Sequence, residues 1–158
     1  DRVPVEIWGL EATSNWQITD SLSLDTFLSW AEGRIDPEDD GTFIAISTQD
    51  VPPIRISARP SWQATPDLNV FGQIFFSGDR SDGFDDGTDA NPAESYTLID
   101  IGAVYRLDFG GAGAGDLSLQ VTNLFNAEYI PPGEATFIPG RIFSGQGRAI
   151  TLSYQHQF

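Results

Sequence analysis

Apolar and polar residues alternate along most of this 158-residue chain, and the alternation is strictest at its end. From Ile150 to Phe158, one face carries apolar or aromatic groups and His156, and the other carries only Thr, Ser and Gln. A period of two is typical of a β-strand with one apolar face. Soluble domains usually end on polar, frayed residues. A membrane barrel instead closes with its last strand, because an unpaired strand edge cannot face lipid. The pattern therefore favours a membrane β-barrel.

The same alternation upstream predicts an all-β fold, an antiparallel up-and-down meander of about seven strands. We expect these strands at residues 3–16, 21–31, 53–63, 68–77, 96–109, 116–123 and 150–158. The turns near Asp20, Pro66 and Gly113 are short, whereas the connections around Asp39, Asp85 and Gly133 are long and polar. Short turns at one rim and long loops at the other are typical of outer-membrane barrels.

Aromatic residues near the predicted strand ends agree with this interpretation. They are Trp16, Trp30, Trp62, Tyr105 and Tyr154. In a barrel they would form the girdles at the membrane interfaces, and in a soluble β-sandwich they would form the core. Arg55 and Arg59 share the opposite, polar face. That face would line a barrel lumen or contact water in a sandwich.

Composition excludes several classes of function. The formal net charge is −15, and the chain has no Lys and no Cys. Nucleic-acid binding, which needs a basic surface, is therefore disfavoured, and no disulfide or thiolate metal site is expected. No apolar run approaches the ~20 residues of a membrane helix. Because the chain starts at Asp1 rather than Met, we expect a processed chain or a fragment.

Candidate chemistry is sparse. One acidic loop has the carboxylate density of a calcium site, with its carboxylates at Asp79, Asp82, Asp85, Asp86 and Asp89. Its spacing departs from the EF-hand, so a solvated acidic loop is the preferred interpretation. His156 is the only histidine and has no nearby Cys or His. No nucleophile or acid pair fits a catalytic motif, so we expect neither enzymatic activity nor a cofactor.

Two elements near the end of the chain resemble a known family. Asn123-Leu124-Phe125-Asn126 with Tyr129 is followed, after a loop, by Gly147-Arg148 opening a strand that ends at Phe158. This pair of elements resembles the C-terminal end of TonB-dependent outer-membrane receptors. The resemblance implies a transmembrane barrel of twenty-two strands filled by an N-terminal plug. Residues 1–158 would then be only its C-terminal strands, because the plug and the TonB box are absent.

The resemblance also implies a location and an orientation. The chain would lie in the bacterial outer membrane, and seven strands would place its ends on opposite sides. The long acidic loops would be extracellular and the C-terminus periplasmic. Implied partners are the TonB system, acting through the missing N-terminal part, the membrane lipid and the barrel-assembly machinery.

The implied function is uptake of a metal chelate, with a ferric siderophore as the expected substrate. Arg groups suit anionic chelates, and aromatic groups suit catecholates. The candidate ligand residues of the long loops are Arg34, Phe43, Arg80, Phe84, Tyr129, Phe137, Arg141 and Phe143. Packing among the loops is the alternative role for each of them. Two other classes of protein remain open: a small complete outer-membrane barrel of eight strands, and a soluble calcium-dependent β-sandwich adhesion module.

Overall fold

The computed structural model describes residues 4–36, 38, 40–46, 52–80, 93–131 and 144–157. Its elements, in chain order, are β1 (Val5–Thr19), β2 (Leu22–Ile35), β3 (Ile44–Ile46), β4 (Ile54–Thr65), β5 (Leu68–Ser77), β6 (Tyr96–Asp108), the 3-10 turn η1 (Gly110–Ala112), β7 (Ala114–Thr122) and β8 (Ala149–Gln157). The described residues include no helix that is long and apolar enough to cross a membrane.

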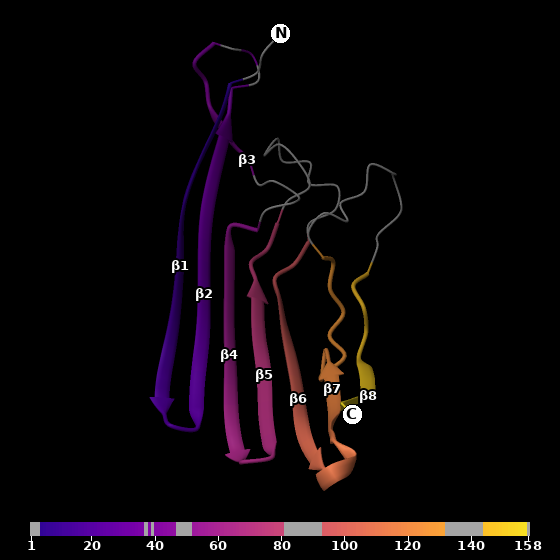
Figure 1. Ribbon diagram of the computed structural model, residues 1–158. Coiled ribbons are helices and arrows are strands. Elements are labelled where there is room, and N and C mark those ends of the chain that lie inside the picture. The colour runs from indigo at the N-terminus through magenta and orange to yellow at the C-terminus, as the bar shows by residue number, and fades with distance from the viewer. Residues whose placement is uncertain are drawn as a thin grey trace.

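Seven of these strands form one antiparallel meander in the order β1-β2-β4-β5-β6-β7-β8. Figure 1 shows a single sheet with β1 at one edge and β8 at the other. The two ends of the chain lie at opposite ends of the strands (Figure 1). The predicted open, up-and-down meander of about seven strands is therefore confirmed.

The strand limits differ from the prediction mainly in the first hairpin. We expected the second strand to stop near Ala31, but β2 continues to Ile35. The extension exists because residues 32–35 pair with the first residues of β1, from Val5 to Trp8, and because β3, which was predicted as loop, pairs with residues 33–35 on the other side. The Glu-Gly-Arg sequence of this segment has no strong strand propensity. The strand is stabilised there by pairing with a segment that is distant in the chain.

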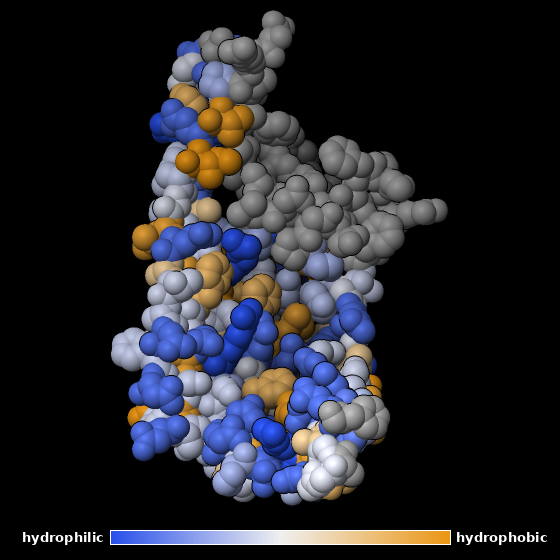
Figure 2. All heavy atoms as spheres, in the orientation of Figure 1, coloured by the Kyte–Doolittle hydropathy of each residue, from blue (hydrophilic) through white to orange (hydrophobic). Residues whose placement is uncertain are grey.

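The sheet has two chemically different faces. The apolar face carries rows such as Leu28, Ile56 and Phe76, which lie directly opposite one another on β2, β4 and β5. The polar face carries the residues between them, for example Asp25 opposite Arg59. Figure 2 shows one side of the molecule, on which hydrophilic side chains predominate below the grey loops. Such a division is expected for a wall that separates lipid from a polar lumen.

No second layer covers the apolar face within the part of the chain that the structure describes. Besides Pro52, Ala93 and Tyr96 carry the only apolar or aromatic side chains of the described residues that are buried. Leu10, Leu152 and Ile150 are 61%, 68% and 70% exposed, respectively. A continuous apolar face of this size is far larger than the isolated patches of soluble monomers. This arrangement argues against a two-layer soluble sandwich.

Exposed tryptophans on the apolar face form two rows. Trp8 and Trp30 lie toward the long loops, and Trp16 and Trp62 lie toward the short turns. Trp8 and Trp16 are eight residues apart on β1, which corresponds to about 26 Å along a strand. An outer-membrane barrel has an apolar band of about 25 Å between its aromatic girdles. Because barrel strands tilt by about 35–45°, this length corresponds to about 18–21 Å along the membrane normal, somewhat less than the height of that band. Tyr105 continues the lower row opposite Leu68.

Polar groups on the apolar face satisfy one another. Ser14 and Thr26 share a hydrogen bond of 2.6 Å between β1 and β2. The indole N–H of Trp16 donates to the Ser14 hydroxyl at 2.5 Å. Because no water is available in a hydrocarbon layer, such mutual pairing removes the main cost of placing hydroxyl groups there.

Candidate functional site

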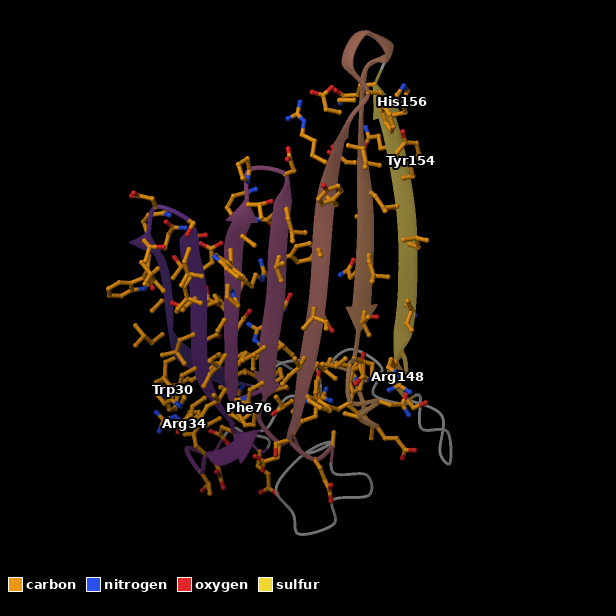
Figure 3. All side chains as sticks on the ribbon, turned by 90° about the horizontal axis from the view of Figure 1, so that it is seen from below. Trp30, Arg34, Phe76, Arg148, Tyr154 and His156 are labelled. Atoms are coloured by element: carbon orange, nitrogen blue, oxygen red, sulfur yellow. The ribbon has the colours of Figure 1, made fainter. Side chains whose placement is uncertain are left out.

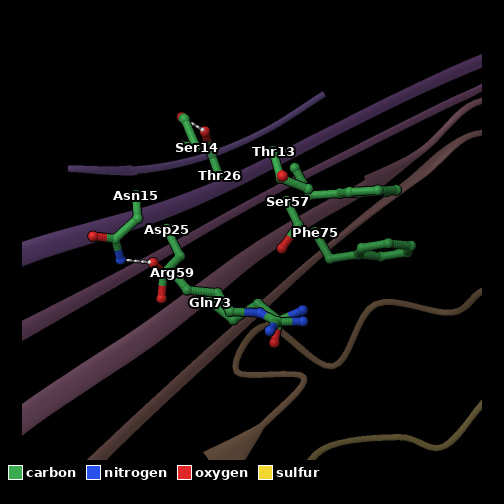
Figure 4. A pocket seen from close by; sticks show the side chains of 10 residues that line it. Thr13, Ser14, Asn15, Asp25, Thr26, Ser57, Arg59, Gln73 and Phe75 are labelled. Atoms are coloured by element: carbon green, nitrogen blue, oxygen red, sulfur yellow. Dashed lines mark hydrogen bonds between the residues drawn. The ribbon is translucent and has the colours of Figure 1, made fainter. Parts of the chain in front are cut away.

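The polar face contains two adjoining hollows. The larger has a volume of about 590 Å³ and lies over β1, β2, β4 and β5 (Figure 4). The smaller has a volume of about 290 Å³ and extends toward β6 and β7. Both are lined by Asp25, Arg59 and Gln73. The volume of the larger hollow falls within the range of small-molecule sites, about 300–1,000 Å³.

The backbone beneath the hollows has a gap in its pairing. The pairing of β4 with β5 omits Arg59 and Pro60, although the pairs on either side are regular. A proline has no N–H group and is uncommon inside a central strand. Gly72 lies near this gap, where an added Cβ would come within 3.2 Å of the Asp100 carbonyl oxygen. Pro60 was visible within the predicted strand, but its effect on the neighbouring strand depends on the fold.

Arg55 lies one level above the hollows, toward the long loops. Its Nη2 donates to the Ser29 hydroxyl at 3.4 Å and lies 3.9 Å from the Glu11 carboxylate. Its guanidinium group also lies 5.8 Å from the centre of the Phe27 ring. Phe27 and Phe75 are on the polar face, opposite Ser57. Neither residue was predicted as part of a site, although a large apolar group at a polar-face position is a signal that the sequence contains.

Aromatic rings continue from this wall to the base of the loops. The Phe75 and Tyr96 rings lie 6.1 Å apart, and the Tyr96 and Tyr129 rings lie 4.7 Å apart. The Tyr129 ring also lies against the backbone of Gly145. Of the candidate ligand residues, Tyr129 is thus placed above the polar face, where it packs between the strand and the loop.

Arg80 also lies at the base of the loops. It is 4% exposed, and its backbone pairs with that of Ala93 in both directions. Its Nη2 donates to the Ile130 carbonyl oxygen. The side chain therefore links the segment after β5 to the segment after β7. The structure places Arg80 near Tyr129 in this way, because Ile130 directly follows Tyr129.

Arg34 and Phe43 occupy a different face from Tyr129. Arg34 is in β2 rather than in a loop, and it lies opposite Glu6 on the same face as Trp8. It forms an ion pair of 2.6 Å with Glu6. Its guanidinium group lies 5.5 Å from the Trp8 ring and 4.4 Å from the Phe43 ring. Figure 3 shows Arg34 on the same side as Trp30, so the structure separates this cluster from the polar-face residues.

The motif after β7 forms a compact structure that we call the loop-base clamp, consisting of Asn123, Leu124, Asn126 and Arg148. Asn123 is 4% exposed and has a φ of 48°. Its amide Nδ2 donates to the carbonyl oxygens of Ala127 at 2.9 Å and Gln146 at 3.1 Å, and its Oδ1 accepts from the Ala127 N–H at 2.8 Å. One side chain therefore holds both ends of the β7–β8 connection.

Neighbouring strands complete the clamp. The Asn123 N–H donates to the Asp100 carboxylate at 2.7 Å, and the Leu124 N–H donates to the Ile99 carbonyl oxygen at 2.8 Å. Asn126, which has a φ of 54°, accepts from the Arg148 N–H at 2.9 Å. The Arg148 guanidinium group lies 3.4 Å from the Leu124 carbonyl oxygen. Asparagine tolerates positive φ better than most residues, which explains its presence at both turn positions.

Two further motif positions, Phe125 and Gly147, differ in how closely they are packed. Phe125 is 73% exposed. At Gly147 an added Cβ would come within 3.0 Å of Asn126 Oδ1, so any larger residue would crowd the clamp. The clamp thus combines side-chain hydrogen bonds from Asn123, Asn126 and Arg148 with positive φ at the two asparagines. Figure 3 places Arg148 at the start of β8 and Tyr154 and His156 toward its end.

Some candidate residues lie outside the described part of the chain. They are Asp82, Phe84, Asp85, Asp86, Asp89, Phe137, Arg141, Phe143 and Phe158. Of the candidate calcium ligands, only Asp79 is described, and it is exposed. The described residues contain no group of three or more His, Cys, Asp or Glu side chains suited to a metal ion.

An acidic turn after β2 is organised by its own side chains. The buried Asp36 carboxylate accepts from the Asp40 N–H at 3.2 Å and the Gly41 N–H at 2.7 Å. The pKa of Asp40 lies below its usual value, because its carboxylate accepts hydrogen bonds from the Thr42 side chain and backbone. These carboxylates are therefore used in stabilising a turn.

The chain is similar in sequence to known proteins over most of the sheet. A sequence model of the family described as "TonB dependent receptor-like, beta-barrel" matches residues 4–124. The chain is 29% identical over 126 residues to the "Iron-regulated outer membrane virulence protein" of Vibrio cholerae serotype O1, a match covering 78% of this chain and 18% of that protein.

Solved structures share the same arrangement of strands. The ferripyoverdine receptor of Pseudomonas aeruginosa, bound to ferripyoverdine, gives a TM-score of 0.69 at 17% identity, covering 95% of this chain and 19% of that chain. The siderophore receptor PiuA from Acinetobacter baumannii gives 0.68 at 17% identity, covering 95% of this chain and 21% of that chain. The chain therefore spans about a fifth of the length of the proteins it matches.

Proposed function

Because the chain belongs to the TonB dependent receptor-like β-barrel family, we propose that it forms the C-terminal strands of an outer-membrane receptor that imports a ferric siderophore. Import would be energised through TonB, acting on an N-terminal part that residues 1–158 do not include. The family comprises receptors rather than enzymes, and no catalytic step enters the proposal.

One structural observation carries the proposal. A single meander separates an apolar face with two tryptophan rows from a polar face with arginine and aromatic side chains. The first face suits lipid, and the second suits a passage for a polar, charged solute. The related proteins include a ferripyoverdine receptor and an iron-regulated outer-membrane protein, which supports iron chelates as the class of substrate.

The orientation follows from the placement of turns and loops. In our proposal, the turns at Asp20 and Pro66 and the C-terminus face the periplasm, and the acidic connections face the exterior. The proposal also includes contact of the apolar face with lipid and recognition of the last strand by the barrel-assembly machinery. It is supported by the family and by the opposite positions of the chain ends in Figure 1.

For the ligand contacts, we propose a division of roles. Arg80 and Tyr129 organise the loop bases, because their side chains contact neighbouring loop segments. Arg34 and Phe43 stabilise the tall first hairpin through the contacts with Glu6 and Trp8. The remaining loop candidates are proposed as direct chelate contacts, namely Phe84, Phe137, Arg141 and Phe143.

Uptake of radioactive iron tests this function. The full-length receptor would be expressed in a Gram-negative bacterial strain that lacks its own siderophore receptors. Ferric hydroxamates and ferric catecholates would be supplied at nanomolar concentration. We expect accumulation of iron from at least one class, and its loss in an otherwise identical strain without TonB. Accumulation that is the same with and without the receptor, across both classes, would contradict the proposal.

A further inference from the structure

A compact group of residues lies where two long connections meet. One connection, residues 78–95, joins β5 to β6, and the other, residues 123–148, joins β7 to β8. The group, which we call the loop joint, consists of Arg80, Ala93, Tyr96, Tyr129 and Gly145. Arg80, Ala93 and Tyr96 are buried, whereas the apolar face of the sheet is exposed along its length. The joint therefore combines buried packing with a buried positive charge.

Each connection is closed at its own base by backbone hydrogen bonds. The Arg80 N–H donates to the Ala93 carbonyl oxygen at 2.8 Å, and the Ala93 N–H donates back to Arg80 at 2.9 Å. In the other connection, the Gly145 N–H donates to the Tyr129 carbonyl oxygen at 2.7 Å. The Tyr129 ring covers Gly145, where an added Cβ would overlap the ring. Arg80 and Tyr129 are thus the residues at which the two bases close.

The same two residues also contact the opposite connection. Arg80 Nη2 donates to the carbonyl oxygen of Ile130, which directly follows Tyr129. The Tyr129 ring lies 4.7 Å from the ring of Tyr96, at the end of the β5–β6 connection. Each residue that closes one base is therefore bound to the other base as well.

This arrangement penalises the displacement of one base alone. If residues 129–131 moved away, the buried Arg80 guanidinium group would lose a carbonyl acceptor, and a buried charged donor is costly to leave without its acceptor. If residues 78–80 moved away, the Ile130 carbonyl oxygen would lose its donor. Segments that depend on each other for buried contacts open together as one cooperative unit. The two bases should therefore be stable together or not at all.

We propose that Arg80 is a positioning residue that joins the two connections into one cooperative unit and so fixes their relative placement for binding a ferric chelate. The residues proposed above as direct chelate contacts belong to these two connections. A chelate that binds one connection then stabilises the other as well, because coupling between sites is reciprocal. This inference rests on the proposed import function, which it deepens by assigning a residue that sets affinity without touching the chelate.

Hydrogen exchange tests the cooperative unit. It would be measured by mass spectrometry on the full-length receptor in lipid nanodiscs. Arg80→Met removes the guanidinium group from the β5–β6 connection, and we expect peptides containing Gly145, in the other connection, to exchange about tenfold faster. Tyr129→Leu should in turn accelerate exchange of peptides containing Ala93. Arg80→Lys, which keeps a charged donor, should give an intermediate rate.

Arg34→Met is a matched control for the exchange measurement. Arg34 also contacts a carboxylate and aromatic rings toward the long loops, but it does so within the first hairpin. Its replacement should leave the peptides containing Ala93 and Gly145 unchanged. Acceleration confined to the connection that carries the substitution would overturn the cooperative unit. If Arg80→Met does not reach the outer membrane, Arg80→Lys and Tyr129→Leu decide the question in the same way.

Uptake kinetics then test the positioning role, with ferrioxamine B and the ferric complex of 2,3-dihydroxybenzoate as probes. For a probe that the wild type imports, Arg80→Met should raise the half-saturating concentration about tenfold and leave the maximal rate within about twofold, because only binding depends on the joint. Arg80→Lys should restore part of the affinity. An unchanged half-saturating concentration would overturn the positioning role with import intact. Import of neither probe by the wild type would contradict the import function for these chelates, and the positioning role would fall with it, whereas hydrogen exchange still decides whether the cooperative unit exists.

Discussion

At the scale of single residues, Asn123 has the most consequential set of contacts. It combines a positive φ, near-complete burial and side-chain hydrogen bonds to both ends of the β7–β8 connection. Sequence analysis identified the residue through a family motif and assigned it no physical role. Its role became visible only when the fold placed Gln146 beside it, twenty-three positions further along the chain.

Replacing this side chain should weaken the barrel measurably. Asn123→Ala leaves the Gln146 carbonyl and the Ala127 backbone groups without their partner. We expect the free energy of unfolding of the full-length receptor in lipid vesicles to fall by about 3 kcal/mol. Guanidinium titration measures this. Asn69→Ala is the control, because it removes a less buried amide that bonds Ser61 at 3.1 Å, and its cost should stay near 1 kcal/mol.

Asn123→Gly separates the two properties of the residue. Glycine accepts the positive φ but makes no side-chain hydrogen bonds. If the hydrogen bonds matter most, the glycine variant should be destabilised nearly as much as the alanine variant. A glycine variant as stable as the wild type would show that only the backbone conformation is important.

At the scale of elements, β5 and β6 are joined by an aromatic ring lying over a glycine. An ideal Cβ at Gly102 would overlap the Phe71 ring and approach the Leu119 carbonyl oxygen to 3.1 Å. Phe71 lies directly opposite Gly102 on the polar face. Covering a strand glycine with a cross-strand aromatic group is a recognised means of stabilising a sheet.

Gly102→Ala should therefore cost about 2 kcal/mol, because the ring must leave its position. Adding Phe71→Leu should recover part of the loss, since the smaller side chain leaves room for the methyl group. Gly111→Ala is the matched control, because nothing lies within 4 Å of its added Cβ. The three variants would be compared by guanidinium unfolding. Equal stability of Gly102→Ala and Gly111→Ala would exclude the proposed packing.

The last strand gives a prediction about assembly. Phe158→Asp should lower the amount of receptor in isolated outer membranes several-fold, because we expect the terminal aromatic group to be recognised during insertion. A carboxylate near the interface costs little folding energy, so stability alone would not explain such a loss. Gln157→Asp places the same charge one residue earlier, on the opposite face. Equal abundance of the two variants would contradict a special role for Phe158.

The period-two alternation of apolar and polar residues predicted most of the strands. The limits of β5 agree with the sequence, since the turn at Pro66 is marked by its own residues. The extension of β2 and the existence of β3 were missed, because both depend on pairing between segments with weak local signals. For the same reason, Arg34 was expected in a loop although it belongs to a strand. Phe27 and Phe75 were not predicted on the polar face, because they are exceptions to the regular alternation that assigns polar residues to that face.

At the scale of the whole molecule, the sheet has two free edges and an uncovered apolar face. Within the described residues, β1 and β8 each pair with one strand only. Leucine, isoleucine and tryptophan side chains on the apolar face are exposed along its length. In the proposed receptor, further strands and lipid would cover these surfaces, whereas in water they favour association.

Residues 1–158 produced alone should therefore not form a stable monomer in water. We expect aggregates without detergent, and recovery of dispersed protein with detergent. Size-exclusion chromatography with light scattering measures the first outcome, and thermal unfolding followed by circular dichroism tests cooperativity. A monomeric peak in plain buffer with a single sharp transition would contradict the assignment of the apolar face to lipid.

The loop-base clamp also fixes the residue at which the last strand of the sheet begins. Asn126 binds the Arg148 N–H immediately before Ala149, where β8 begins. Side chains alternate between faces, so a slip of one residue would turn Thr151 and Ser153 toward lipid and Leu152 toward the lumen. By fixing the first residue of β8, the clamp favours the observed alignment of β8 with β7 over the alignment shifted by one residue. Errors in this hairpin would then appear as inside-out strands rather than as unfolded protein.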